Sequence, residues 1–251
     1  MDFVQSFDYH PDMVTPPRRR WHQFGIKGLF AAVAILALPL GWHMRNVHRQ
    51  QAIVARIQQL GGSVTYDYQL VATQNGLKTR VANPKASTLG SWLGVDHVHD
   101  VVSVTLSNAN VTDDDLRLLA QLPKLQGIDL QESNMLNDSL ECLKAIPDLR
   151  FLNLRHTSID DDGLEFIICH KNLKLLNLSQ THLSDAGLAR LESLDNLAWM
   201  DLSQTDLTDN GLQHFGSLDR LTWLVVRATG VTYEGVKRLQ AALPKATIIF
   251  P

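Results

Sequence analysis

The stretches LKLLNLSQTHLSDAGL (residues 173–188) and LAWMDLSQTDLTDNGL (residues 197–212) decide the fold, because they are near copies of one another displaced by 24 residues. Extending the comparison in both directions gives six consecutive 24-residue repeats between Val101 and Lys245. Self-similarity at a fixed period of this length is typical of solenoid proteins, in which each repeat packs against its neighbours. The repeats start at Val101, Leu125, Leu149, Leu173, Leu197 and Leu221.

Five positions of the repeat, the fourth, sixth, eleventh, sixteenth and nineteenth, are apolar in every copy. Positions four and six alternate along the chain, so their side chains face one side of a short strand. Positions sixteen and nineteen are three residues apart, so they share one face of a helix. The sequence therefore predicts an α/β solenoid, with a strand and a helix in each repeat that bury their apolar sides only when repeats stack. The strand positions are Val104, Ile128, Leu152, Leu176, Met200 and Leu224, and Leu106, Leu130, Leu154, Leu178, Leu202 and Val226.

The start of each helix is indicated by the twelfth position, which is Thr112, Asp160, Ser184, Thr208 and Thr232 in five repeats. These residue types cap exposed backbone N–H groups. In four of these repeats an acidic residue follows at the thirteenth position (Asp113, Asp161, Asp185 and Asp209), where the helix dipole favours a negative charge. The second repeat has Leu136 at the cap position, so we expect its helix to start more loosely or elsewhere.

These repeats resemble the leucine-rich repeats of the short ribonuclease-inhibitor-like and F-box-associated type. The resemblance covers about 145 of the 251 residues. It implies parallel strands along a concave face and helices along a convex face, and it implies no catalytic residues or cofactor, because the family shares none. It also implies protein recognition by the concave face. Together with the apolar N-terminus described next, the chain resembles a bacterial membrane-anchored member of this group.

An uncharged stretch of 15 residues runs from Gly28 to Trp42, and residues 24–44 extend it to 21 residues with Lys27 near one end. A helix of 21 residues rises about 31 Å, which matches the roughly 30 Å hydrocarbon core of a bilayer. We expect residues 24–44 to form a single transmembrane helix. A cleaved signal peptide and a soluble helix are the alternatives, but the long N-terminal region and the absence of a small-residue cleavage site disfavour the first.

Charge is distributed unevenly along the chain. Residues 1–60 carry seven Lys and Arg against three Asp, a net charge of +4. Because the whole chain has a net charge of −3, residues 61–251 have a net charge of −7. An acidic main region is poorly suited to nucleic acid, whereas the basic start suits an anionic membrane surface. The triplet Arg18–Arg20 favours a cytoplasmic N-terminus, with the repeats outside the cytoplasm.

The sequence around the repeats predicts the remaining organisation. Residues 1–23 form a basic tail, residues 45–100 an N-terminal cap, residues 101–245 the repeats and residues 246–251 a capping strand. Within the cap we expect a helix over Gln50–Leu60 that ends at Gly61-Gly62. Asn75-Gly76 predicts a hairpin turn, and residues 87–93 a short helix that places Trp92 against the first repeat.

Motifs of known enzymes and metal sites are absent from the sequence, which has no P-loop, H-E-x-x-H, G-x-S-x-G or C-x-x-C. His97 and His99 would share one side of a strand and need a third ligand, so a surface location is favoured over a metal site. Cys142 and Cys169 stand at different repeat positions, which favours two thiols over a disulfide. His170 replaces a Leu or Ile of the other repeats, and we expect it near the edge of the solenoid.

The strand positions that point away from the core carry the candidate binding residues. The third position supplies Phe151, Leu175, Trp199 and Trp223, the fifth supplies Asp201, and the seventh supplies Arg155 and Arg227. Aromatic side chains surrounded by polar and charged groups are typical of protein interfaces. The alternative is that Trp199 and Trp223 only pack on each other and stiffen the sheet.

We therefore expect a membrane-anchored scaffold that is not an enzyme and that binds a protein or peptide through its concave face. A structural cell-envelope protein that associates through its convex helices is the second hypothesis. A hydrolase or metal protein that uses His97 and His99 is the third.

Overall fold

The computed structural model describes residues 26–67, 70–72, 78–80 and 99–251. The chain divides into two compact units, Met1–Met44 and Arg45–Pro251. The helix α1 (Ile26–Gln59) supplies all the described residues of the first unit and continues into the second. In the part of the chain that is described, no helix is both long enough and apolar enough to cross a bilayer, so the transmembrane helix expected over residues 24–44 is not shown. Phe24 and Gly25, the first residues of the expected span, lie outside the described residues.

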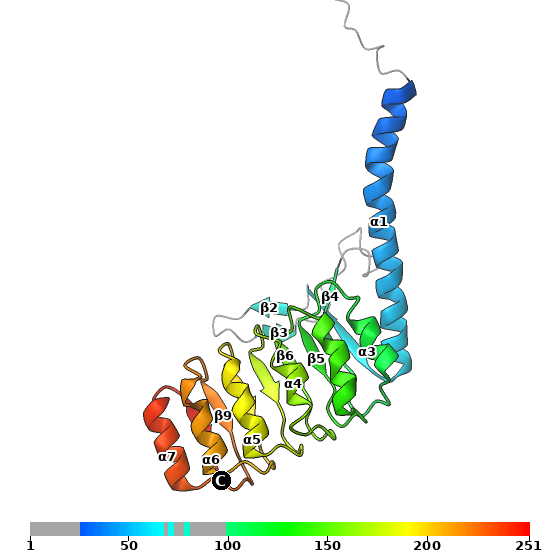
Figure 1. The fold of residues 1–251 in the computed structure, drawn as a ribbon. Helices are drawn as coiled ribbons and strands as arrows, with labels where there is room; N and C mark the ends of the chain where they lie inside the picture. The colour runs from blue at the N-terminus through cyan, green and yellow to red at the C-terminus, as the bar shows by residue number, and fades with distance from the viewer. Residues whose placement is uncertain (1–25, 68–69, 73–77, 81–98) are drawn as a thin grey trace, which may run out of the picture. The chain divides into compact units, whose positions relative to one another are not determined.

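The second unit is organised around one sheet of eight strands in the order β1-β4-β5-β6-β7-β8-β9-β10 (Figure 1). β4 to β10 run parallel, each one repeat after the last, and β1 joins β4 antiparallel. The strands are β1 (Ser63–Tyr66), β4 (Val101–Thr105), β5 (Gly127–Asp129), β6 (Phe151–Asn153), β7 (Leu175–Asn177), β8 (Trp199–Asp201), β9 (Trp223–Val225) and β10 (Thr247–Ile249). The parallel strands confirm the α/β leucine-rich-repeat solenoid predicted from positions four and six.

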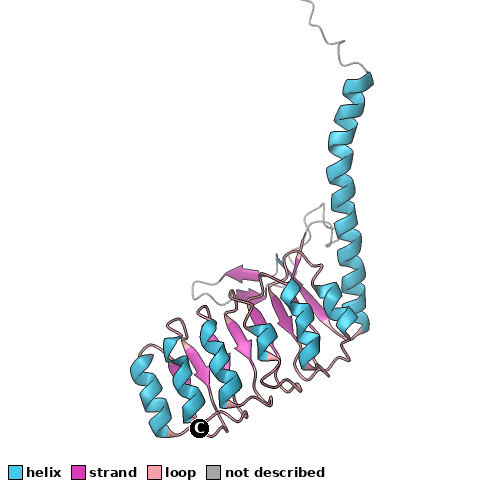
Figure 2. Cartoon of the chain, viewed as in Figure 1, coloured by secondary structure: helices cyan, strands magenta, loops and turns pink. Residues whose placement is uncertain are grey.

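Each repeat returns to the next strand through a short helical segment on one side of the sheet (Figure 2). Only the first and last repeats contain an α-helix of more than one turn, and the others use one α-turn, 3₁₀ geometry or both. The segments are α3 (Asp113–Leu119), η3 (Asn137–Ala145), α4 (Leu164–Ile167), α5 (Asp185–Leu188), η4 (Ala189–Ser193), α6 (Asp209–Leu212), η5 (Gln213–Ser217) and α7 (Tyr233–Ala242).

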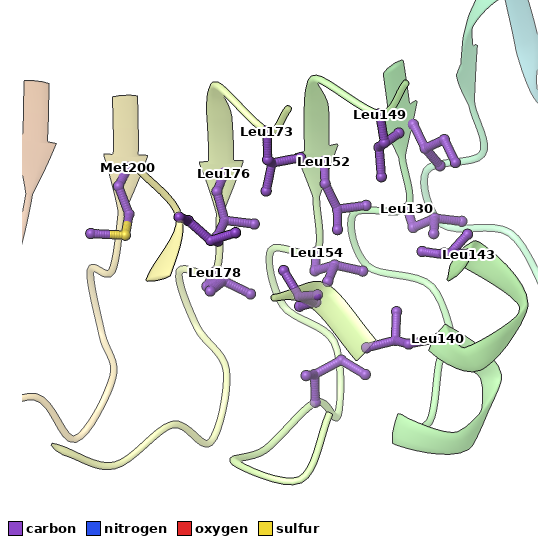
Figure 3. Packing of buried hydrophobic residues seen from close by; sticks show 14 of the residues in the cluster. Leu130, Leu140, Leu143, Leu149, Leu152, Leu154, Leu173, Leu176, Leu178 and Met200 are labelled. Carbon is purple, nitrogen blue, oxygen red and sulfur yellow. The ribbon is translucent and has the colours of Figure 1, made fainter. Parts of the chain in front are cut away.

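The core is a set of parallel rows of leucine side chains, as Figure 3 shows for Leu152, Leu154, Leu176 and Leu178. All five apolar columns predicted from the sequence enter it, and only Val231 and Val236 of the last repeat are partly exposed. Each row continues from one repeat into the next, so a single core runs through the whole stack. Burial of each leucine contributes on the order of 2 kcal/mol to the free energy of unfolding.

The N-terminal end of this core is closed by the last turns of α1 and by β1. Ile53, Val54 and Ile57 are buried against the first repeat. After α1 ends, Gly61 adopts φ 80°, a left-handed conformation that favours glycine, and this turn leads into β1. The expected helix with its Gly61-Gly62 stop is therefore present.

An ion pair ties α1 to the first repeat. Arg56 Nε lies 2.7 Å from Asp115 Oδ1, and the Asp115 side chain is only 5% exposed. Asp115 also completes a capping box with Thr112 at the start of α3. The hydrogen bond from Arg56 is the main reason why the pKa of Asp115 lies below its ordinary value.

The C-terminal end is closed by β10, which pairs with β9 in the register Thr247↔Trp223. Elsewhere, β2 (Leu70–Ala72) and β3 (Lys78–Arg80) pair antiparallel, as the hairpin prediction requires. The turn residues Asn75 and Gly76, the expected helix at 87–93 with Trp92, and His97 lie outside the described residues.

The predicted helix caps are only partly correct. Thr112, Thr208 and Thr232 each accept a hydrogen bond from a backbone N–H at a helix start. Ser184 makes no such bond, and α4 starts at Leu164 rather than just after Asp160. Leu136 precedes a 3₁₀ segment and makes no side-chain cap, which confirms the looser start expected for the second repeat.

The acidic residues at the thirteenth position connect neighbouring repeats. Asp161, Asp185 and Asp209 each accept two hydrogen bonds from the twelfth residue of the following repeat, one from its backbone N–H and one from its hydroxyl. These residues form what we call the Asp ladder, with donor–acceptor distances of 2.5–2.9 Å. The helix dipole alone does not account for these carboxylates, because they also connect one repeat to the next.

Candidate functional site

The predicted binding residues occupy the side of the sheet that faces away from the leucine core, which we call the outward face. The pairings Phe151↔Leu175, Leu175↔Trp199 and Trp199↔Trp223 place the four third-position side chains directly beside one another on β6 to β9. Neighbouring strands lie about 4.8 Å apart, so this third-position row is about 14 Å long. The structure therefore brings these four residues together.

The third-position row is accessible to solvent. Leu175 is 41% exposed and Trp223 is 43% exposed, whereas Phe151 and Trp199 are half-buried. Toward the first repeat the row ends in small residues, Gly127 and Ser103. A Cβ added at Gly127 would lie 3.4 Å from Phe151 Cδ1, so the aromatic ring covers this glycine. The apolar surface is thus confined to the last four repeats.

Asp201, a predicted binding residue, also stabilises the bend that follows β8. Its Oδ1 accepts hydrogen bonds from the backbone N–H and the hydroxyl of Ser203, at 2.9 and 2.6 Å. The same turn recurs where Asp129, Asn153 and Asn177 accept from the N–H of the residue two positions later. The fifth position therefore stabilises the bend after four of the six repeat strands, which is why short Asp and Asn side chains recur there.

Four exposed cations flank the third-position row. Arg150 and Lys174 directly precede its members on β6 and β7, and Arg155 and Arg227 follow the ends of β6 and β9. Arg155 Nε lies 3.4 Å from Gln180 Oε1. None of the four forms an ion pair with another described residue. Sequence analysis selected Arg155 and Arg227 and missed Arg150 and Lys174, although the second position of the repeat could have pointed to them.

The bend after each strand uses a left-handed residue in all six repeats. The φ angles at the eighth position lie between 52° and 60°, although none of these residues is glycine. They are Asn108, Glu132, His156, Gln180, Gln204 and Ala228. Their side chains form the rim of the outward face, where Gln180 donates a hydrogen bond to Gln204.

The described residues contain no cluster of three or more His, Cys, Asp or Glu side chains that could hold a metal ion. His99 Nδ1 lies 2.9 Å from Asp67 Oδ1, a pairing that engages one of the two candidate ligands. The other, His97, is outside the described range.

Cys142 and Cys169 are both free thiols, as the repeat positions favoured. Burial raises the pKa of each thiol above its ordinary value. Thiolate is the reactive form of cysteine, so neither residue is set up as a nucleophile at neutral pH.

The sequence led us to expect His170 near the edge of the solenoid, but its side chain is only 2% exposed and lies inside the stack. Its Nε2 has no hydrogen-bond partner among the described residues. Burial lowers the pKa of this imidazole and so favours the neutral form. The side chain occupies a position where the other repeats place aliphatic residues such as Leu194, so the packing of the stack determines its burial.

Comparison with known proteins supports the repeat assignment. The family model described as Leucine Rich repeat matches residues 146–167, close to one repeat length. The repeat region therefore has a leucine-rich-repeat fold, because the matched unit recurs in sequence and in structure from Val101 onward. Among curated proteins no match is found.

Two solved structures from Listeria monocytogenes are similar to this chain. Internalin C2 has 20% sequence identity and a TM-score of 0.46, over 59% of this chain and 70% of that one. Internalin F has 19% identity and a TM-score of 0.42, over 59% of this chain and 46% of that one. The matched region is thus less than half of the internalin F chain.

Proposed function

We propose that this protein is a non-enzymatic scaffold that recognises a protein or peptide partner through the outward face of its repeats. The observation that carries the proposal is the continuous, partly exposed row formed by Phe151, Leu175, Trp199 and Trp223. Contiguous apolar surface bordered by polar groups is a feature of interaction sites on soluble domains. Leucine-rich-repeat proteins are generally interaction scaffolds, which agrees with this reading.

Mutual packing of the aromatic side chains is the competing explanation. Neighbouring rings across a sheet stabilise one another by up to about 1 kcal/mol. However, packing does not require Leu175 and Trp223 to remain more than 40% exposed. A role in partner binding accounts for the exposed area, and a role in sheet stability does not.

The decisive experiment is crosslinking in native membranes with the full chain and with the Trp199→Ser/Trp223→Ser variant. We expect the variant to lose the crosslinked partners by at least about tenfold, because buried aromatic anchors dominate interface energies. Leu136→Ser/Tyr233→Ser is the matched control, since Leu136 and Tyr233 are 63% and 66% exposed on the helical side. Partners that survive loss of the two tryptophans but not loss of Leu136 and Tyr233 would favour the cell-envelope alternative, in which the helical side mediates association.

We also propose that the apolar part of α1 attaches the protein to a membrane. Between Val33 and Trp42 its large apolar side chains are 54–73% exposed, namely Val33, Ile35, Leu36, Leu38, Leu40 and Trp42. These positions are spread around the whole circumference of a helix, so no single protein face would cover them. Lipid contacts a helix on all sides and would remove this area from water.

Membrane attachment is tested by washing membranes with high salt and with carbonate. We expect the full chain to stay in the pellet and a Leu36→Lys/Leu38→Lys variant to be released, because charge near the middle of an apolar helix costs about 3 kcal/mol per residue. Release of the unmodified chain by carbonate would contradict the anchor.

The proposed orientation places the N-terminus in the cytoplasm and the repeats outside it, as Arg18–Arg20 favour. Cys169 is an exposed thiol in the third repeat, so it reports the location of the repeats. A membrane-impermeant maleimide should label intact cells that express the unmodified chain but not a Cys169→Ser variant. Labelling that appears only after lysis would reverse the orientation.

A further inference from the structure

The charges around the third-position row are divided between its two halves. In the strand and bend segments of the third and fourth repeats, residues 149–158 and 173–182, the only Lys, Arg, Asp or Glu are Arg150, Arg155 and Lys174. In the fifth repeat, residues 197–206 contain two Asp and no cation, and in the sixth repeat, residues 221–230 contain Arg227 as their one charged residue. Three of the four cations therefore border the part of the row on β6 and β7, which we call the basic half, and the two tryptophans lie in the other half on β8 and β9.

The three cations of the basic half have no opposite charge within the described structure to neutralise them. All three are exposed, and none makes an ion pair with a described residue. They stand out because residues 61–251 carry a net charge of −7. Exposed cations without a paired carboxylate provide electrostatic complementarity to an anionic partner.

The dimensions fit an extended peptide. The row is about 14 Å long, which equals four to five residues of extended chain at about 3.3 Å each. On the third repeat Arg150 directly precedes β6 and Arg155 follows its end, so the two cations lie on opposite sides of the row. A peptide on the row would therefore have a cation within reach on either side of its backbone.

From this arrangement we infer that the partner is an extended protein segment in which a cluster of carboxylates adjoins aromatic or aliphatic residues. Its acidic part lies over β6 and β7, where Arg150, Lys174 and Arg155 contact it. Its apolar part lies over Trp199 and Trp223 on β8 and β9. The inference rests on the proposed function, and it adds the chemical class of the partner.

Four fluorescein-labelled peptides added to the full chain test this inference by anisotropy. The sequences FLFEEE, FLFQQQ, FLFKKK and SSSEEE separate the contribution of charge from that of apolar contact. We expect FLFEEE to bind most tightly and FLFKKK more weakly than FLFQQQ. Raising the salt from about 0.05 M to about 0.5 M should weaken FLFEEE and leave FLFQQQ nearly unchanged, because exposed charges are screened.

The matching variants are Arg150→Glu/Lys174→Glu and a control of equal charge change, Lys144→Glu/Lys237→Glu. Lys144 and Lys237 are exposed and lie on the helical segments η3 and α7. We expect the first variant to weaken FLFEEE by about tenfold and to strengthen FLFKKK. The control should leave the ranking of the peptides unchanged.

The possible failures are distinguishable. If Trp199→Ser/Trp223→Ser weakens every FLF peptide while FLFQQQ binds as tightly as FLFEEE, the outward face is a binding site but the acidic partner is wrong. Sensitivity of FLFEEE to Arg150→Glu/Lys174→Glu without sensitivity to the tryptophan variant would overturn the proposed recognition by the aromatic row. An oligothymidylate that binds as tightly as FLFEEE would replace the peptide with a general polyanion. Absence of binding by all four peptides would overturn the inference outright.

Discussion

Residue 187 has to be glycine because an oxygen atom of the neighbouring repeat occupies the space of a side chain. A Cβ at this glycine would overlap Asp161 Oδ1, the atom that accepts a hydrogen bond from the backbone N–H of Ser184 at 2.9 Å. The same relation recurs between Gly211 and Asp185 and between Gly235 and Asp209. Asp and Gly recur two positions apart in the third to fifth repeats because the Asp of one repeat contacts the Gly of the next repeat.

Gly187→Ala should destabilise the protein by about 1–3 kcal/mol, the usual cost of overpacking a site where the neighbour cannot move freely. Asp161→Ala removes the clashing oxygen but also removes the acceptor for Ser184. In the double variant the cost of the alanine at 187 should therefore be smaller than in the single variant, and urea denaturation measures this coupling. Strictly additive effects would show that the contact between Asp161 and Gly187 does not determine the glycine.

The buried imidazole of His170 makes the free energy of unfolding of the stack depend on pH. Because burial lowers its pKa in the folded state, the unfolded chain binds a proton at a higher pH than the folded chain does. The stability is therefore complete above the ordinary pKa of about 6.5 and decreases as the pH falls through the lower folded value.

His170→Leu, which restores the residue type of Leu194, should reduce the loss of stability between pH 7 and pH 5. It should also raise the free energy of unfolding at pH 7 by about 1 kcal/mol, because Nε2 no longer needs a partner. Thermal denaturation at a series of pH values measures both effects. The exposed His182→Gln is the control, and an unchanged pH profile in His170→Leu would exclude His170 as the cause.

At the scale of elements, α1 replaces the repeat that would otherwise precede the first one. Asp115 stands at the repeat position where later repeats have Gly187, Gly211 or Gly235. No Asp ladder residue reaches this position from before, so the first repeat has room for a side chain, and Arg56 of α1 pairs with it. At the boundary between cap and first repeat, the Arg56–Asp115 ion pair thus replaces the Asp–Gly contact found between later repeats.

Arg56→Ala should loosen α1 and β1 before the rest of the stack. The change leaves the Asp115 carboxylate nearly buried without its cation, which is unfavourable. Because the pKa of Asp115 is lowered mainly by Arg56, the stabilisation is present above the ordinary Asp value and is lost as the pH falls through the folded pKa. Hydrogen exchange should show faster opening of residues 45–66 in this variant.

Arg117→Ala is the matched control, since Arg117 pairs with Asp114 on the exposed surface of α3. Exposed pairs contribute little, so exchange over residues 45–66 should not change. Equal effects of the two substitutions would show that α1 is held by its apolar side chains alone.

The sequence predicts contacts well where one repeat is compared with itself and poorly where different kinds of element meet. Columns such as Leu152, Leu176 and Met200 are visible because the same burial recurs every 24 residues. Arg56 and Asp115 are 59 residues apart and occur once, so no periodicity reveals them. Arg150 and Lys174 were missed for another reason: position two varies in residue type between repeats, so no column draws attention to it, although it directly precedes the third-position row.

At the scale of the molecule, the second unit behaves as a one-dimensional stack. From the third repeat onward, each repeat contributes the same three links to the next, namely the strand pairing, the leucine rows and the hydrogen bonds of the Asp ladder. Stability in such a stack is close to a sum over repeats and their interfaces. Removal of one whole repeat should therefore be tolerated, provided that the two repeats that become neighbours present equivalent residues to each other.

Deletion of residues 173–196, one full repeat, should therefore leave a folded protein. The third repeat would then face the fifth, so Asp161 would meet Thr208 and Gly211 in place of Ser184 and Gly187, which are equivalent residue types. We expect a circular dichroism spectrum of native shape and a single cooperative thermal transition at a lower temperature, since one interface is lost. Deletion of residues 173–184 is the control, because half a period places a strand against a helical segment and exposes both leucine rows. Unfolding of the full-repeat deletion, or equal tolerance of both deletions, would contradict a stack held together by equivalent nearest-neighbour contacts.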